Sequence, residues 1–143
     1  MTPPNEQYAL FTVTGDFDPA RITTRVGVVP TRSWAKGTAD RFGIKKKKTS
    51  GWSLYSRIGR TEPLEAHVED VLAQMRVNAG EFRAVAAEFA GRMQLVGMFY
   101  GGYPGLRLEP EQVTGLAEFG LEVDFDFYDM DVDRMGRDFP DAG

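Results

Sequence analysis

The sequence contains no cysteine and a single histidine, His67, among its 143 residues. The absence of cysteine excludes disulfide bonds, thiolate metal sites and thiol nucleophiles. One histidine excludes a three-histidine zinc site, and a Ser-His-Asp triad would have to combine His67 with Ser33, Ser50, Ser53 or Ser56. None of these serines lies in a nucleophile-elbow pattern, and His67 lies at the border of an apolar helix stripe. We therefore expect no catalytic residue, no metal and no cofactor.

Long apolar runs are also missing. Residues 1–7 are polar and rich in proline, so the sequence predicts neither a signal peptide nor a membrane span, and we expect a cytoplasmic location. The composition is 42% apolar with 17 aromatic residues, which is ample for one hydrophobic core. We expect residues 1–128 to form a single α+β domain and residues 129–143 to form an acidic C-terminal tail.

Charge is distributed unevenly, although the net charge is only −4. Residues 1–60 carry 11 basic and 4 acidic residues, whereas residues 61–143 carry 6 basic and 17 acidic residues. The two populations can pair across the folded surface, and this is the interpretation we favour. A sequence pI near 5.0 argues against a dedicated nucleic-acid binder, for which a strongly basic domain is expected.

Hydrophobic periodicity predicts five strands and four helices. The strands are expected at residues 8–14, 51–58, 93–100, 106–109 and 121–128, with the third and fourth forming a hairpin. The helices are expected from Asp18-Pro19 to Gly27, from Glu62-Pro63 to the Asn78 break, around Phe82 before Gly91, and from Pro110 to Gly120. This order, β-α-β-α-α-β-β-α-β, predicts a mostly antiparallel five-stranded sheet with helices on one face.

The segment 31–50 has no clear periodicity and contains four consecutive lysines at residues 45–48. Neighbouring side chains of an extended chain point to opposite sides, so these lysines cannot all face one partner. We interpret the segment as a solvated, mobile loop. It also resembles a phosphate-binding loop superficially, but Lys47 stands where the second glycine of that motif is required.

Aromatic and basic residues accompany this loop. Large aromatic rings and directed cationic donors are typical of binding hot spots, so the cluster indicates a site for a protein partner or an anionic ligand. The alternative is that both tryptophans close one end of the core while the cations extend into solvent. The candidate binding residues are Arg21, Trp34, Lys36, Trp52 and Tyr55.

The last predicted strand alternates apolar and polar residues, and its polar side carries Asp124, Asp126 and Tyr128. Two carboxylates about 7 Å apart on one strand face have a spacing suited to flanking a glycosidic bond. Amphipathic patterning alone also produces this pattern. Beyond it, Asp129, Asp131 and Asp133 have calcium-loop spacing, but arginine and proline replace the required glycine and glutamate of that loop.

Several short motifs resemble one bacterial family. They are Asp18-Pro19, Ile22-Thr23, Gly27, Pro30, Trp34 with Lys36-Gly37, and Gly51-Trp52 near the start, and Gly120-Leu121, Phe125-Asp126 and Tyr128 near the end. In this order and spacing they resemble the family catalogued as domain of unknown function 4279, over almost the whole chain. The resemblance implies a small bacterial α+β domain, and it brings no established activity or catalytic residue.

Two functional hypotheses follow. The first is a non-catalytic bacterial protein that recognises another protein, as an interaction, immunity or regulatory module. The alternative is a small-molecule-binding domain or a carboxylate-dependent enzyme that uses the polar side of the last strand. Neither requires a membrane or nucleic acid, and no feature of the sequence sets an oligomeric state.

Overall fold

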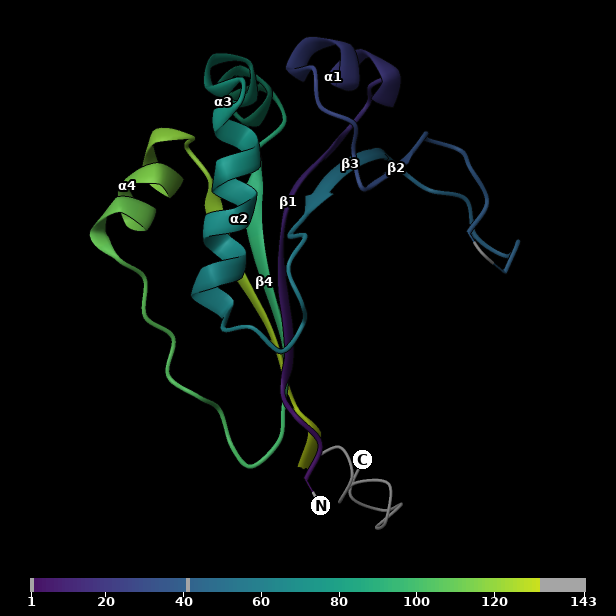
Figure 1. Ribbon diagram of the computed structural model, residues 1–143. Coiled ribbons are helices and arrows are strands. Elements are labelled where there is room, and N and C mark those ends of the chain that lie inside the picture. The colour runs from purple at the N-terminus through teal and green to yellow at the C-terminus, as the bar shows by residue number, and fades with distance from the viewer. Residues whose placement is uncertain (1, 41, 132–143) are drawn as a thin grey trace.

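A computed structural model describes residues 2–40 and 42–131. The elements are β1 (Glu6–Gly15), α1 (Pro19–Val26), β2 (Arg32–Trp34), β3 (Ser50–Tyr55), α2 (Leu64–Arg76), α3 (Ala79–Glu88), β4 (Arg92–Phe99), α4 (Pro110–Glu118) and β5 (Glu122–Asp129). Figure 1 shows these elements in chain order.

The five strands form one mixed sheet in the order β2-β3-β1-β4-β5. The three pairs β2–β3, β3–β1 and β1–β4 are antiparallel, while β4 and β5 are parallel. A parallel neighbour requires a crossover connection, and α4 lies in the connection between β4 and β5. The register sets the central Phe11 opposite Leu54 on one side and Met93 on the other. The predicted fold class, α+β with a mostly antiparallel five-stranded sheet, is therefore confirmed.

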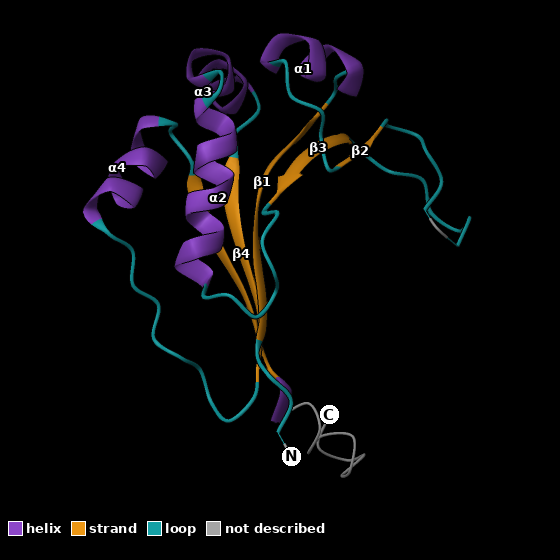
Figure 2. Ribbon diagram, viewed as in Figure 1, coloured by secondary structure: helices purple, strands orange, loops and turns teal. Residues whose placement is uncertain are grey.

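The helices all pack on one face of the sheet, so the fold has two layers (Figure 2). Alternate residues of the strands point toward the helices and form the core together with the apolar stripes of the helices. At its centre, the rings of Phe11, Trp52 and Phe82 contact one another at centroid distances of 5.7 to 6.2 Å in edge or tilted arrangements. Burial of these large rings contributes to the apolar contact between the sheet and the helices.

Local signals set the ends of α1 as the sequence predicts. The Oδ1 atom of Asp18 accepts a hydrogen bond from the Ala20 amide at 3.0 Å, and Pro19 occupies the first helical position. Gly27 ends the helix with a left-handed backbone conformation, φ 70°, and its amide bonds the Thr23 carbonyl.

One strand lies elsewhere than the sequence pattern suggests. Residues 106–109 form no strand; Leu106 and Leu108 pack against the core as part of a loop, so the expected hairpin with β4 is absent. The fifth strand is instead β2, within the segment that we interpret from the sequence as a loop. Three residues are too few to show a period of two, and their pairing depends on the edge that β3 offers.

The lysine-rich segment also has more backbone structure than a loop pattern suggests. The Gly37 amide bonds the Lys47 carbonyl at 2.9 Å, and the Lys47 amide bonds the Thr38 carbonyl at 2.8 Å. This segment therefore folds back on itself as an extension of the β2–β3 connection.

At the other end of the chain, Asp129 belongs to β5, and the rest of the predicted acidic tail from residue 132 lies outside the described residues. Within the described ranges, none of the helices has the length and apolar character needed to cross a membrane.

Candidate functional site

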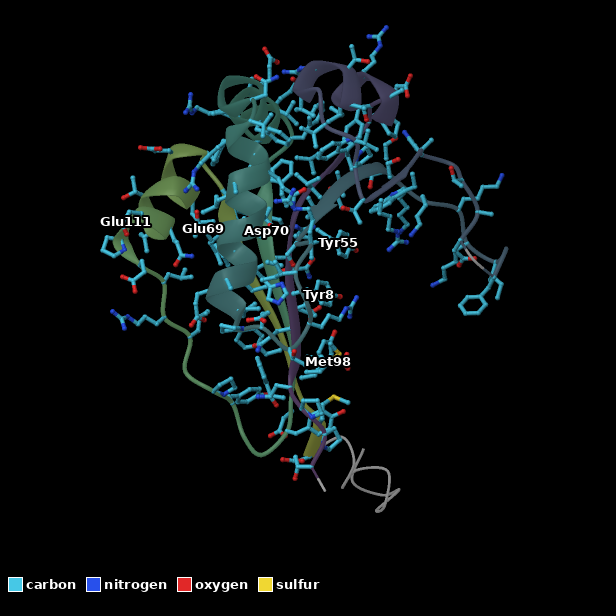
Figure 3. All side chains as sticks on the ribbon, viewed as in Figure 1. Tyr8, Tyr55, Glu69, Asp70, Met98 and Glu111 are labelled. Carbon is cyan, nitrogen blue, oxygen red and sulfur yellow. The ribbon has the colours of Figure 1, made fainter. Side chains whose placement is uncertain are left out.

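The two faces of the sheet differ in what covers them. In the described part of the chain no helix lies on the second face, which we call the helix-free face (Figure 2). The register and the alternation of side chains assign to it Arg32 and Trp34, Ser53 and Tyr55, Tyr8, Leu10 and Thr12, Gln94, Val96 and Met98, and Asp124, Asp126 and Tyr128. Figure 3 shows Tyr8, Tyr55 and Met98 on this side, whereas Glu69 and Glu111 lie on the helix side.

Trp34 lies at the β2 edge of this face, and its ring lies across Gly51 of β3, where a glycine leaves room for it. The indole N–H donates to the Thr49 carbonyl at 3.0 Å, which fixes the orientation of the ring. The Arg32 guanidinium and the Lys47 ammonium each lie 5.0 Å from the ring centroid, within the range of cation–π attraction. We call Trp34, Arg32 and Lys47 the Trp34 cluster.

A second cluster occupies the middle of the helix-free face. The rings of Tyr8 and Tyr55 are stacked with centroids 5.7 Å apart and planes at 14°, and the Arg60 guanidinium lies 4.4 Å from the Tyr8 centroid. We call these residues the tyrosine cluster. Burial raises the pKa of the Tyr8 hydroxyl. The neighbouring Tyr55 and Asp126 raise this pKa further, whereas the Arg60 cation lowers it. The sequence analysis identified Tyr55 but missed Tyr8 and Arg60. Tyr8 could have been found, because strand alternation places it on the face of β1 that points away from the core.

The third group is the carboxylate side of β5. Asp124 and Asp126 lie on the helix-free face, in register with Gln94 and Val96 of β4. Asp124 is exposed and Asp126 is partly buried. Asp126 lies close enough to Tyr8 to raise the pKa of its hydroxyl, so this carboxylate is an electrostatic neighbour of the tyrosine cluster. Their use in catalysis, or in binding a small molecule, stays a prediction.

The remaining members of the predicted binding cluster lie elsewhere. Trp52 is fully buried in the core, and its indole N–H donates to Thr23 Oγ1 at 3.0 Å, so it is separated by the sheet from Trp34 and Tyr55. Arg21 lies exposed on α1, and Lys36 extends from the β2–β3 connection to pair with Asp16 at 3.7 Å. The structure thus brings Trp34 and Tyr55 to one face and leaves the other three residues off it.

His67 is fully buried, which corrects its interpretation as a boundary residue. The reason is that α2 lies flat across the sheet, so the border of its apolar stripe is also covered. The Nδ1 atom of His67 lies 2.7 Å from Ser56 Oγ, and Ser56 Oγ accepts from the Ala9 amide at 3.1 Å. Burial lowers the pKa of His67 despite the opposing effect of nearby carbonyl oxygens and carboxylates.

This pair stabilises the contact between α2 and β1 and has none of the geometry of a catalytic triad. In a triad, the serine bonds Nε2 and a carboxylate bonds Nδ1, whereas here the serine bonds Nδ1. The nearest carboxylate of α2, Asp70, is engaged by Arg57, whose Nη2 atom lies 2.8 Å from Asp70 Oδ1. Burial by itself raises the pKa of Asp70, but hydrogen bonds from Arg57 and Gln74 outweigh this effect and lower it.

Over residues 2–40 and 42–131, no three side chains of histidine, cysteine, aspartate or glutamate gather in an arrangement that could hold a metal ion. Asp133, the third acidic position of the rejected calcium loop, lies outside these ranges.

Comparison with known proteins adds one finding. Neither the curated proteins nor the solved structures gave a significant match to this chain. A family model described as a domain of unknown function, DUF4279, matches residues 5–130, which includes every described helix and strand and the whole helix-free face. The chain therefore belongs to the DUF4279 family.

Proposed function

We propose that this chain is a non-catalytic protein-binding module whose protein partner docks on the helix-free face of the sheet. The observation that supports this proposal is that one uncovered surface gathers the Trp34 cluster, the tyrosine cluster and the β5 carboxylates. Tryptophan, tyrosine and arginine are the residue types most enriched among binding hot spots. The rings are held by stacking and hydrogen bonds before any partner arrives, which lowers the entropy cost of binding.

The charges of this face are separated in a way that orients a partner. The Trp34 cluster lies at the β2 edge, the Arg60 guanidinium lies over Tyr8 of the central strand, and Asp124 and Asp126 lie at the β5 edge. A complementary protein surface carries acidic side chains opposite Arg32, Lys47 and Arg60, and basic side chains opposite the β5 carboxylates. Such complementarity sets orientation and speeds association.

The size of the face agrees with a specific interface. Five strands at about 4.8 Å spacing span about 19 Å, and eight residues of strand extend about 26 Å, which gives a flat area of about 500 Å². Specific complexes bury about 600 to 1,000 Å² on each partner. The relief of the side chains and the lysine-rich extension next to Trp34 supply additional area, so the face is large enough for a protein and far larger than a small molecule needs.

Crosslinking affinity purification from the host, followed by calorimetry with the purified partner, tests the proposal. Two variants change the face, Trp34→Ala and Arg60→Glu. Two matched controls change exposed residues on the helix side, Phe125→Ala and Glu111→Lys. We expect each face variant to weaken the complex by at least about 30-fold, the effect of losing a hot spot, and the controls to leave it unchanged.

The Arg60→Glu loss is expected to shrink at high salt, because screening removes the electrostatic part of the interaction. A partner that binds the face variants as tightly as the wild-type chain would refute the proposed surface. Failure to recover any stoichiometric protein partner from host extracts would refute the proposed function.

A further inference from the structure

A small pocket lies on the helix side of the sheet, at the N-terminal end of α2. Its volume is about 110 Å³. The long connection from β4 to α4 runs past this end of α2 (Figure 1) and contributes part of the wall. The lining residues are Asn5, Gln7, Pro63, Leu64, Glu65, Phe99, Pro104, Gly105, Leu106 and Phe127.

Gln7 is the unusual member of this lining. It is only 8% exposed, yet its side-chain amide has no hydrogen-bond partner among the residues that the structure describes. Among the described residues, the one fully buried side-chain polar atom without a partner is His67 Nε2, so the Gln7 amide keeps access to the pocket, where water or a ligand can complete its hydrogen bonds. The backbone of Gln7 is held in place, because the backbone N–H of Gln7 donates a hydrogen bond to the Arg60 carbonyl at 2.8 Å.

The polar groups around Gln7 have a definite donor and acceptor pattern. Asn5 Oδ1 already accepts from the Tyr100 amide at 2.7 Å, which leaves its NH₂ group as a donor. Helix α2 begins after Pro63 without a side-chain cap, so the first amides, of Leu64 and Glu65, are donors at this end. The Glu65 carboxylate, with no ion-pair partner among the described residues, supplies an acceptor.

The rest of the wall is apolar and small. Phe99 and Phe127 meet edge to face with centroids 5.1 Å apart, and Leu64, Pro63 and Leu106 complete the apolar side. An apolar cavity of about 150 Å³ accepts benzene, so this pocket accepts a group slightly smaller than benzene. The occupant therefore has a short apolar part and a polar head that can both donate and accept hydrogen bonds.

We propose that this pocket binds a small neutral molecule that carries a primary amide on a short aliphatic chain. The amide oxygen would accept from the donors of Asn5, Gln7 and the start of α2, and the amide NH₂ would donate to Glu65 and to Gln7 Oε1. A carboxylate would satisfy the donors but be repelled by Glu65, and an alkylammonium would satisfy Glu65 but face the donors. This site is separate from the helix-free face, so its failure and that of the proposed docking surface are distinguishable.

NMR titration of the ¹⁵N-labelled full chain tests the proposal with three probes of nearly equal size, butyramide, butyrate and butylamine. Molecules this small bind with dissociation constants on the order of millimolar at best. We expect butyramide to bind at least tenfold more tightly than the other two, and to shift the Gln7 side-chain NH₂ signals and the Leu64 and Glu65 amides. Gln7→Met is expected to weaken butyramide binding at least tenfold.

Gln94→Met is the matched control, because Gln94 lies on the opposite face of the sheet and its replacement should leave the titration unchanged. If Gln7→Met does not fold, the shift of the wild-type Gln7 NH₂ signals still decides the outcome. Butyrate binding as tightly as butyramide would overturn the proposal in favour of an anion site at the helix end. Absence of localised shifts with butyramide, or equal loss in Gln94→Met, would also overturn it.

Discussion

The two tryptophans provide the most direct test of how this fold is held together, because the structure assigns them opposite environments. Trp52 is fully buried, its ring contacts those of Phe11 and Phe82, and its indole N–H donates to Thr23 Oγ1. Trp34 lies on the helix-free face, across Gly51, with its indole N–H bonded to the Thr49 carbonyl. Replacing each with alanine should therefore have very different costs.

The cost of Trp52→Ala follows from burial. Truncating a buried tryptophan to alanine lowers the free energy of unfolding by about 3–5 kcal/mol, and this change also leaves Thr23 without its indole partner. For a chain of 143 residues the unfolding entropy is about 0.3 kcal/mol/K, so a loss of about 4 kcal/mol lowers Tm by about 13 °C. Trp34→Ala loses two exposed cation–π contacts of about 0.5 kcal/mol each and one exposed hydrogen bond of about 0.5 kcal/mol, or about 1.5 kcal/mol in total.

Urea unfolding followed by far-UV circular dichroism measures both variants without relying on the fluorophore that each removes. Trp52→Phe and Trp34→Phe give a gentler pair with the same expected ranking, in case Trp52→Ala does not fold. The reasoning is refuted if the Trp34 variants lose as much stability as the Trp52 variants, since that would make both rings part of the core.

Three further predictions concern single positions. Gly51→Ala adds a methyl group that overlaps the Trp34 ring, so the ring should move outward. In a Trp52→Phe background, the Trp34 fluorescence should then become easier to quench with acrylamide. Unchanged quenching would contradict the packing of the ring on Gly51. The pKa of His67 lies below its ordinary value of about 6.5 because burial disfavours the charged form, so the unfolded chain binds a proton that the folded chain does not. The free energy of unfolding should therefore be highest above about pH 6.5 and should fall as the pH is lowered below this value. Because His67 is the only histidine in the sequence, the urea midpoint of His67→Gln should not change between about pH 7.5 and 5.5. Gly97→Ala overlaps the Phe99 ring on the helix side, and we expect a loss of about 1–3 kcal/mol in urea unfolding together with shifted aromatic NMR signals of Phe99; a neutral substitution would show that the ring moves freely.

Much of the candidate site depends on pairings between segments far apart in the chain, and this limits what the sequence could predict. Trp34 and Tyr55 were identified from their residue types, and Asp124, Asp126 and Tyr128 from strand alternation, but as two separate groups. Only the strand order places them on one face, because β1 and β4 lie between β3 and β5. Arg60 and Tyr8 were missed for the same reason.

The sequence alone determined the features that depend on local chemistry. The Asp18 cap, Pro19 and Gly27 set the ends of α1, and the spacing of apolar residues set α2, α3 and α4, because these signals act within one or two helical turns. Tertiary structure decided the rest. The short β2 forms because β3 offers an unpaired edge. Trp52 lies in the core and Trp34 lies outside it, because their side chains point to different faces of paired strands. His67 is buried because α2 lies against the sheet. Each of these outcomes depends on which surface a residue meets, and periodicity along the chain carries no information about that surface.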